Sequence, residues 1–277
     1  MHQNSFSEVD IGPTKSLSLR VSVAVLIRLL FRDPLDGTWT LALERKTTLF
    51  KTGEGNVVEV IAQPFGGGVR ILDLQVLRDL VGDFHFDSER SRSERDFRLF
   101  IQPERWYALR EYCIKQFEHG YDIFIDTDPG RELSEEIADA LHVQLSPSSY
   151  SSRATGIVVE DLPKASENPR AKGYATVRLY RVYEAILTDP YLRDVMIKND
   201  ESKSDMDLEK MAIADAQQGG TGRANGILVT PLEKLTAFYR NLSIEARDQP
   251  VVYDGHKMAE SVLAILDGIT VPRYQRR

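Results

Sequence analysis

The segment at residues 19–31, LRVSVAVLIRLLF, limits the folds open to this chain more than any other feature. Its density of Val, Leu and Ile is typical of a buried β-strand. The sequence DPLDG follows at residues 33–37 and has the composition of a tight turn. Residues 39–44 then alternate apolar and polar side chains, as a second strand would. The two segments therefore predict an antiparallel hairpin near the start of the chain.

Strand-like and helix-like segments alternate along the rest of the chain. Strands are predicted at residues 57–62, 97–101, 121–125, 155–159 and 177–187, and helices at residues 71–81, 103–117, 128–141, 232–242 and 258–266. The polar residues 88–94 and 198–222 are predicted to be mobile loops. Because the hairpin requires antiparallel pairing, the expected fold class is α/β with a mixed sheet. We expect a flexible lead at residues 1–18 and a single domain at 19–277, with an insertion at about 71–120.

Composition narrows the classes of partner and compartment. The net charge of −7 argues against binding to bulk nucleic acid or to an acidic membrane, both of which need a basic face. It leaves a phosphate substrate open, because a bound divalent metal reverses the local field. The one cysteine, Cys113, lies in a helix-like run and is interpreted as a buried apolar residue rather than a nucleophile. A single cysteine and a polar N-terminus without a signal-peptide pattern predict a cytoplasmic protein.

Acidic residues crowd the predicted helix at residues 128–141. Asp128 can cap its start, with Pro129 at the first helical position. A core-facing stripe is predicted from the spacing of Leu133, Ile137, Ala140 and Leu141. The opposite side is expected to carry Glu132, Glu135, Glu136 and Asp139. Like charges three and four residues apart repel one another, whereas a hard divalent cation stabilises such a group. The alternative interpretation is a solvated acidic face.

Residues 131–136, RELSEE, resemble the end of the catalytic box of the Nudix hydrolases. The sequence QPFGGG at residues 63–68 is similar to the glycine-containing element that precedes the box in that family. Residues 39–45 and 176–185 resemble the strands before and after it. The resemblance covers roughly residues 19–190, and it implies the α/β/α sandwich of the family, with extra helices after it.

The box is interrupted in this chain. Counting back eight positions from Arg131 reaches Ile123, where the family has a glutamate, and counting six forward from Gly67 reaches Asp73. An insertion therefore separates the glycines from the acidic helix. Ala138 stands where the family has glycine. The interruption also resembles a divergent Nudix group found beside bacterial nucleotide-second-messenger defence systems.

The resemblance implies a metal-dependent pyrophosphohydrolase. Glu135 and Glu136 would ligate Mg²⁺ or Mn²⁺, Glu132 would be a further ligand or the partner of Arg131, and a bound water would attack phosphorus. The backbone of Gly66, Gly67 and Gly68 would approach the metal or the phosphates. A further carboxylate is expected as a base or as an additional ligand, and the candidates are Asp73, Glu160 and Glu184. For the last two, a structural role is the alternative.

The resemblance also suggests which residues could contact the substrate. Arg28 and Arg45 could bind phosphate through their guanidinium groups, and the alternative is a solvated arginine at a strand edge. The implied substrate is a nucleoside diphosphate linked to another group, such as ADP-ribose or a nucleotide sugar, and the family implies a homodimer. A competing hypothesis is a catalytically impaired module that senses a nucleotide ligand or a protein partner. Convergence of Asp73, Glu160 or Glu184 on Glu135 and Glu136 would favour hydrolysis, and convergence of none of them would favour sensing.

Overall fold

The hairpin expected at the start of the chain is present. Strand β1 (Leu19–Arg32) pairs antiparallel with β2 (Trp39–Thr52), and Leu29 lies opposite Ala42. The turn is closed by the Asp33 side chain, which accepts hydrogen bonds from the backbone N–H groups of Leu35 and Asp36. The side-chain chemistry of the turn, read from the sequence, therefore sets the register of the two strands.

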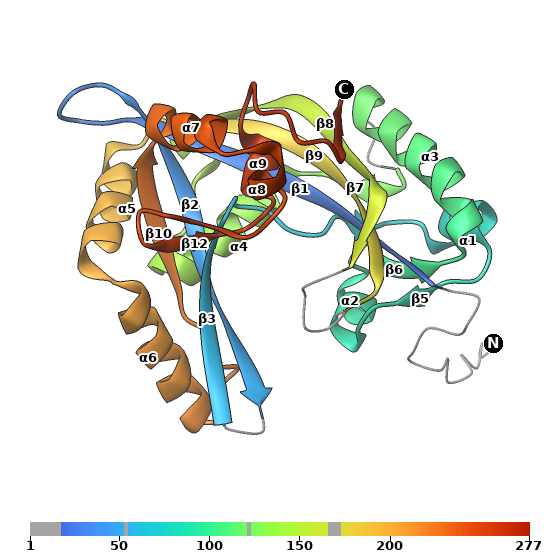
Figure 1. Ribbon diagram of the computed structural model, residues 1–277, viewed down its shortest axis with the longest axis horizontal. Helices are drawn as coiled ribbons and strands as arrows, with labels where there is room; N and C mark the ends of the chain where they lie inside the picture. The colour runs from blue at the N-terminus through green and yellow to red at the C-terminus, as the bar shows by residue number, and fades with distance from the viewer. Residues whose placement is uncertain (1–17, 53–54, 121–122, 166–172) are drawn as a thin grey trace. The chain divides into compact units, whose positions relative to one another are not determined.

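The computed structural model describes residues 18–52, 55–120, 123–165 and 173–277, and these form two compact units (Figure 1). Unit 1 takes its described residues from Met1–Ala24, Gly68–Thr127 and Glu160–Leu179, and unit 2 takes its residues from Val25–Gly67, Asp128–Val159 and Tyr180–Arg277. Both units use parts of β1, β8 (Tyr150–Ala165) and β9 (Ala175–Leu187). The block predicted as an insertion, residues 71–120, falls within the Gly68–Thr127 segment of unit 1. The predicted lead at residues 1–18 lies almost wholly outside the described residues.

Unit 2 contains a mixed sheet in which β2 is central. One edge of β2 pairs with β10 (Asn225–Pro231) along its length from Thr40 to Lys46. The other edge pairs first with β1 and then, from Glu44 onward, with β3 (Gly55–Gln63). Strand β3 runs parallel to β12 (His256–Met258), which pairs antiparallel with β11 (Val251–Tyr253). The predicted α/β class with a mixed sheet is confirmed.

The change of partner on β2 leaves a gap between β1 and β3, and the glycine bend fills it. We use this name for residues 64–68, which follow β3 and return to β1. The backbone N–H of Ile27 donates to the Phe65 carbonyl at 2.8 Å, and that of Val25 donates to the Gly67 carbonyl at 2.9 Å. The bend therefore pairs with β1 at the point where β2 no longer does.

Helices flank the sheet of unit 2. These elements, with the remaining short ones, are α4 (Pro129–Leu141), η2 (Pro147–Ser149), α5 (Pro190–Ser202), α6 (Asp205–Gln217), α7 (Leu232–Asn241), α8 (Ile244–Arg247), α9 (Val262–Ile265) and β13 (Tyr274–Arg276). Helix α4 begins as predicted, because the Asp128 side chain accepts from the Gly130 backbone N–H at 2.9 Å and Pro129 follows it. Helices α5 and α6 run beside β10, β2 and β3 (Figure 1).

Two loops predicted from polarity were wrong. Residues 198–222 contain the end of α5 and all of α6, because Ser204 and Asp207 form a reciprocal capping box and Leu208 and Ala212 pack on Val60. Residues 88–94 contain α2 (Glu89–Glu94), which Ser88 caps by accepting from the Ser91 backbone N–H. Capping and a few buried contacts outweigh the polar composition in both segments. The helix predicted at residues 258–266 is shorter, since β12 includes Met258 and α9 begins at Val262.

Unit 1 places helices against a small sheet. Its further elements are β4 (Arg70–Ile71), α1 (Leu74–Val81), β5 (His85–Phe86), β6 (Arg98–Ile101), η1 (Pro103–Arg105), α3 (Trp106–His119) and β7 (Ile125–Asp126). Strand β6 pairs antiparallel with β1 and with β5, and β4 pairs with β7. Cys113 is buried in α3, and burial raises the pKa of its thiol, as expected of an apolar rather than a nucleophilic cysteine.

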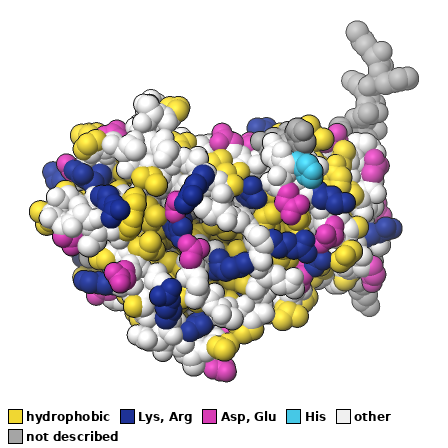
Figure 2. Space-filling model, turned by 90° about the horizontal axis from the view of Figure 1, so that it is seen from above, with side chains coloured by type: hydrophobic (Ala, Val, Ile, Leu, Met, Phe, Trp, Pro, Cys, Tyr) yellow, Lys and Arg dark blue, Asp and Glu magenta, His cyan; other side chains and the backbone are white. Residues whose placement is uncertain are grey.

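Surface features add two observations. None of the helices in the described part of the chain is both long enough and apolar enough to cross a membrane. Figure 2 shows acidic and basic side chains interspersed over the face that it draws.

The cap of α6 gives a first prediction. Replacing Ser204 by alanine removes the side-chain oxygen that accepts from the Asp207 N–H at 3.2 Å, and we expect the free energy of unfolding to fall by about 1 kcal/mol. Urea unfolding followed by circular dichroism measures it. The exposed Ser202 is the control, and Ser202→Ala is expected to change stability by less than about 0.5 kcal/mol. Equal effects of the two substitutions contradict the capping argument.

Candidate functional site

Helix α4 divides its acidic residues between two environments. Glu132 and Glu136 are buried, with 8% and 7% of their surface exposed, whereas the Glu135 side chain is 63% exposed. Asp139 is also exposed. The predicted core stripe is confirmed at Leu133, Ile137 and Ala140. Because Glu132 and Glu136 are four residues apart, they project from the same side of the helix. The spacing does place all four acids on one side of the helix, but it did not predict that Glu132 and Glu136 are buried while Glu135 and Asp139 are exposed.

The glycine bend touches both buried glutamates. The backbone N–H of Gly66 donates to Glu136 Oε2 at 2.6 Å. A Cβ atom on Gly67 would lie 2.1 Å from Glu132 Oε2, so a side chain at that position would collide with the carboxylate. Gly66 has φ +133°, which L-residues rarely adopt, and a Cβ there would lie 2.1 Å from the Val25 carbonyl oxygen. The bend and the helix expected to approach one another do so through these contacts.

Gly68, the third glycine of the bend, belongs to unit 1. A Cβ atom on Gly68 would overlap the Asp96 carboxylate. Burial raises the pKa of Asp96, and its carboxylate forms an ion pair of 2.7 Å with Arg98. The absence of a side chain at Gly68 is thus explained by packing within unit 1.

Glu44 is a third carboxylate at this place, and the sequence analysis did not select it. It is fully buried on β2, at the residue where β3 replaces β1 as the partner strand. Its carboxylate accepts from Gln63 Nε2 and from Asn225 Nδ2, both at 3.0 Å. A signal was available, because an acidic residue occupies a buried position of an alternating strand. We call Glu44, Glu132 and Glu136 the carboxylate cluster.

Lys46 joins two members of the carboxylate cluster. Its Nζ lies 3.3 Å from Glu44 Oε2 and 3.4 Å from Glu136 Oε1, so two carboxylates share one positive charge. Burial alone would lower the pKa of Lys46, but the charges of Glu44 and Glu136 raise it. Burial raises the pKa of Glu136 well above its usual value, and the charge of Glu44 adds to this. Burial and the neighbouring charge of Glu44 therefore both disfavour the ionised form of Glu136.

Arg131 orients Glu132. Its Nη2 lies 2.6 Å from Glu132 Oε1, and its Nη1 lies 3.7 Å from Glu135 Oε1. The predicted pairing of Arg131 with Glu132 is therefore present. Of the predicted ligands on α4, Glu132 and Glu136 meet the glycine bend, whereas Glu135 is mainly exposed to solvent.

Arg45 lies on the other face of β2. Successive residues of a strand project to opposite faces, so Arg45 points away from its neighbours Glu44 and Lys46. It is 1% exposed, and its guanidinium group lies 3.3 Å from Asp205 and 3.8 Å from Asp200. These contacts attach α5 and α6 to the sheet. The structure does not bring Arg45, predicted to bind phosphate, to the carboxylate cluster.

Arg28 and Glu184 occupy a separate network. Leu29 pairs with Ala42 and shares the face of Glu44, so Arg28 projects to the opposite face. Arg28 forms ion pairs with Asp267 and, at 2.5 Å, with Glu184, which also accepts from Arg153 at 2.8 Å. Burial alone would raise the pKa of Glu184, but the hydrogen bonds and charges of the two arginines lower it. Glu184, predicted to be a base, is thus an ion-pair partner.

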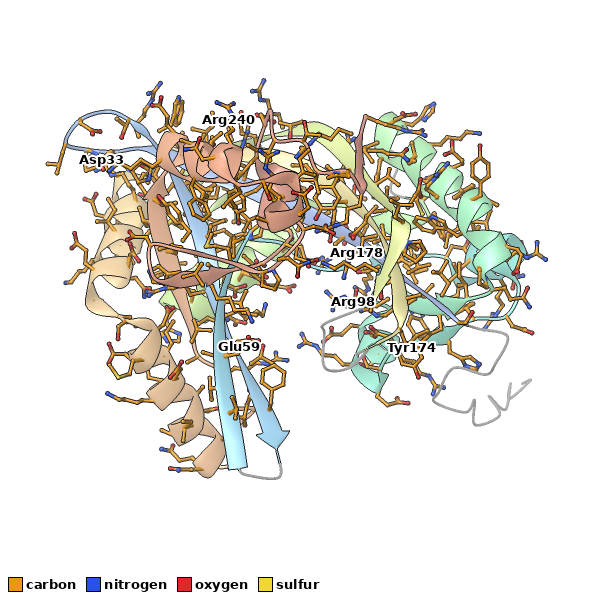
Figure 3. All side chains as sticks on the ribbon, in the orientation of Figure 1. Asp33, Glu59, Arg98, Tyr174, Arg178 and Arg240 are labelled. Atoms are coloured by element: carbon orange, nitrogen blue, oxygen red, sulfur yellow. The ribbon has the colours of Figure 1, made fainter. Side chains whose placement is uncertain are left out.

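The other two predicted acids belong to unit 1. Asp73 caps α1, where its side chain accepts from the backbone N–H groups of Gln75 and Val76 at 2.8 and 3.1 Å. Glu160 is fully buried and accepts from Arg178 Nη1 at 2.9 Å. Arg178, labelled in Figure 3, belongs to β9. The structure gives both acids local structural partners.

The carboxylate cluster suits one mode of metal binding. Over the described ranges of the chain, no group of three or more His, Cys, Asp or Glu side chains is placed to hold a metal ion. Mg²⁺, however, is commonly bound by one or two carboxylates together with waters and substrate phosphates. Glu132 and Glu136 offer hard oxygens, and the Glu132 carboxylate occupies the space that a side chain at Gly67 would take. The residues therefore fit a metal bound together with a phosphorylated substrate rather than a preformed cage.

Substitution of Gly66 and substitution of Gly67 are expected to affect stability to different extents. We expect Gly66→Ala to lower the free energy of unfolding by at least about 1–3 kcal/mol, because its φ is strained and its new Cβ meets the backbone. Gly67→Ala is expected to cost less, since the obstructing Glu132 carboxylate ends a flexible side chain and can rotate. Chemical denaturation of both variants measures the difference. A loss in Gly67→Ala equal to that in Gly66→Ala contradicts this account.

The Glu184 network predicts a pH dependence. Its lowered pKa in the folded state stabilises the protein above the unfolded value near 4.5, and this contribution is lost as the pH falls through the folded pKa. We expect Glu184→Gln to lower the free energy of unfolding by about 1.5–3 kcal/mol at pH 7 and by progressively less below about pH 4.5. Urea unfolding at several pH values measures this, with the exposed Glu201→Gln as control. A deficit that does not change with pH contradicts the ionic origin.

Comparison with known proteins returns no relative. No family model, no curated protein and no solved structure matches this chain. The carboxylate cluster, the glycine bend and Lys46 are therefore the observations on which a functional assignment depends.

Proposed function

We propose that the chain hydrolyses the pyrophosphate bond of a nucleoside diphosphate linked to another group, at the carboxylate cluster and in the manner of a Nudix hydrolase. The observation that carries the proposal is the hydrogen bond of 2.6 Å from the Gly66 backbone N–H to Glu136. It joins the two segments, residues 63–68 and 131–136, that resemble the family's motif although an insertion separates them. Their contact supports one interrupted box and, with it, a Nudix-type sandwich.

Glu132 and Glu136 are the residues that would hold Mg²⁺ or Mn²⁺. The ion supplies Lewis-acid polarisation of the diphosphate and lowers the pKa of a bound water. Gly66 fixes the orientation of Glu136 through its N–H, and Arg131 fixes that of Glu132 at 2.6 Å. Gly66 and Gly67 lack side chains where the β1 backbone and the Glu132 carboxylate lie, so the bend packs directly against both.

Glu44 acts as a positioning residue in this proposal. It is fully buried, so it does not present its carboxylate to a water in an open site. Hydrogen bonds from Gln63 and Asn225 hold it rigidly, and its negative charge lies close enough to Glu136 to raise the pKa of that group. Concentrated negative charge of this kind favours a divalent cation over a monovalent one.

A second candidate function is supported by Lys46. Its ammonium group already supplies a cation to Glu44 and Glu136, so the cluster can be stable without a metal. A module of this kind would bind a nucleotide ligand or a protein partner without turnover. Hydrolysis therefore requires a metal ion in the cluster, whereas sensing does not.

The experiment that separates them is a screen of nucleoside diphosphate derivatives, with Mg²⁺ and with Mn²⁺, for release of nucleoside monophosphate. We expect Glu136→Gln to lower turnover about a hundredfold or more, because loss of a metal ligand removes several kcal/mol of transition-state stabilisation. Asp139→Asn is the matched control, since it removes a carboxylate from an exposed position of the same helix. It is expected to retain the turnover of the unmodified protein.

Structure and binding measurements complete this test. Circular dichroism and thermal unfolding establish that Glu136→Gln is folded. Unchanged turnover in that folded variant contradicts the proposed hydrolase. Calorimetric binding of a nucleotide by a protein that shows no turnover with either metal favours the sensing module instead.

A further inference from the structure

Lys46 is placed between the carboxylates by the geometry of β2. Residues two apart in a strand project to the same face, so Glu44 and Lys46 point together toward α4. The Lys46 ammonium then reaches Glu136 at 3.4 Å. Its side chain is 35% exposed, while those of Glu44 and Glu136 are 0% and 10% exposed. Lys46 is thus more accessible to solvent than either of its two partners.

The two oxygens of Glu136 have different partners. Oε2 accepts from the Gly66 backbone N–H, and Oε1 contacts Lys46. The first contact is part of the folded backbone, whereas the second is made by a flexible side chain. A divalent cation that binds Glu136 therefore competes with Lys46 for Oε1. Two cations this close together repel one another, so binding of the metal and the ion pair with Lys46 exclude each other.

Comparison with Arg45 shows that Lys46 is not held as a structural cation is held. Arg45 is 1% exposed, lies between two aspartates and cannot leave its position without unpacking α6. The contacts of Lys46, at 3.3 and 3.4 Å, are similar in length to those of Arg45, but its side chain is 35% exposed and is not enclosed by packed elements. Its unbranched stem allows the ammonium group to move by rotation of side-chain bonds alone.

We propose that Lys46 is a resident counter-ion that a divalent cation displaces from the carboxylate cluster, and that the displaced ammonium contacts phosphate oxygens of the substrate. This inference rests on the proposed function. Lys46 is then a positioning and binding residue for the diphosphate group. The exchange couples the arrival of the metal to the appearance of a phosphate-binding cation beside it, and it needs no movement of the backbone.

The first test uses the unmodified protein. Short exposure to acetic anhydride, followed by mass spectrometry of peptides, measures the reactivity of each lysine amine. We expect Mg²⁺ to increase acetylation of Lys46 several-fold, and a methylene-bridged analogue of ADP-ribose added with Mg²⁺ to reverse the increase. Lys257 is the matched control, because it forms an ion pair with Glu59, labelled in Figure 3, and its side chain is 40% exposed. Its acetylation should not change.

The second test measures metal affinity without substrate. Titration with Mn²⁺, monitored by electron paramagnetic resonance, is expected to show roughly tenfold tighter binding to Lys46→Met than to the unmodified protein, because a competing like charge is gone. Lys257→Met should bind with unchanged affinity. Circular dichroism checks that both variants are folded, and the acetylation test does not depend on either.

The outcomes separate this inference from the proposed function. Hydrolysis with no effect of Mg²⁺ on Lys46 acetylation overturns the role of Lys46 alone. Metal-dependent exposure of Lys46 in a protein without turnover supports the exchange and overturns the hydrolase. Absence of Mn²⁺ binding at millimolar concentrations in the unmodified protein and in Lys46→Met overturns both.

Discussion

The hydrogen bond between the Gly66 backbone and Glu136 is the contact on which the candidate site depends. It exists because β2 exchanges β1 for β3 at Glu44, which leaves the intervening bend to pair with β1 alone. An N–H group on such a bend needs an acceptor when it is buried. Helix α4 supplies a carboxylate, and the φ of +133° at Gly66 directs the N–H toward it. The contact therefore requires the strand exchange on β2, the glycine at position 66 and the glutamate on α4 together.

The acids of unit 2 fall into two electrostatic classes. For Glu184 and Asp205, burial alone would raise the pKa, but arginine or histidine partners outweigh it and lower the pKa. For Glu136, burial and the charge of Glu44 outweigh Lys46 and Gly66, and its pKa is raised. Structural ion pairs produce the first class. A raised pKa alone does not mark a functional position, because burial also raises the pKa of Asp200, which pairs with Arg45; the contact of Glu136 with the glycine bend distinguishes it.

Local periodicity predicted the parts of the site that depend on neighbouring residues. The hairpin, the cap at Asp128 and the buried stripe of α4 follow from turn chemistry and helical spacing. The burial of Glu132 does not, because Glu132 lies outside the stripe and contacts the glycine bend, which comes from a distant part of the chain. Glu44 was missed for the same reason, since its partners Gln63 and Asn225 come from distant strands. Helix α6 was also missed, because the prediction for its residues relied on their polar composition and not on the capping box.

A nearby cation stabilises a buried pair of carboxylates. Of the cationic side chains, lysine is held least rigidly, because its ammonium group lies at the end of a flexible stem. An arginine in the place of Lys46 would be fixed by its planar donors, as Arg45 is fixed by two aspartates. A lysine contributes one charge, two long contacts and a mobile stem. It offsets part of the negative charge of the cluster, and in the proposed exchange an ion of twice the charge takes its place. In the proposed exchange, the residue that neutralises the cluster without a metal is also the residue that a divalent cation displaces.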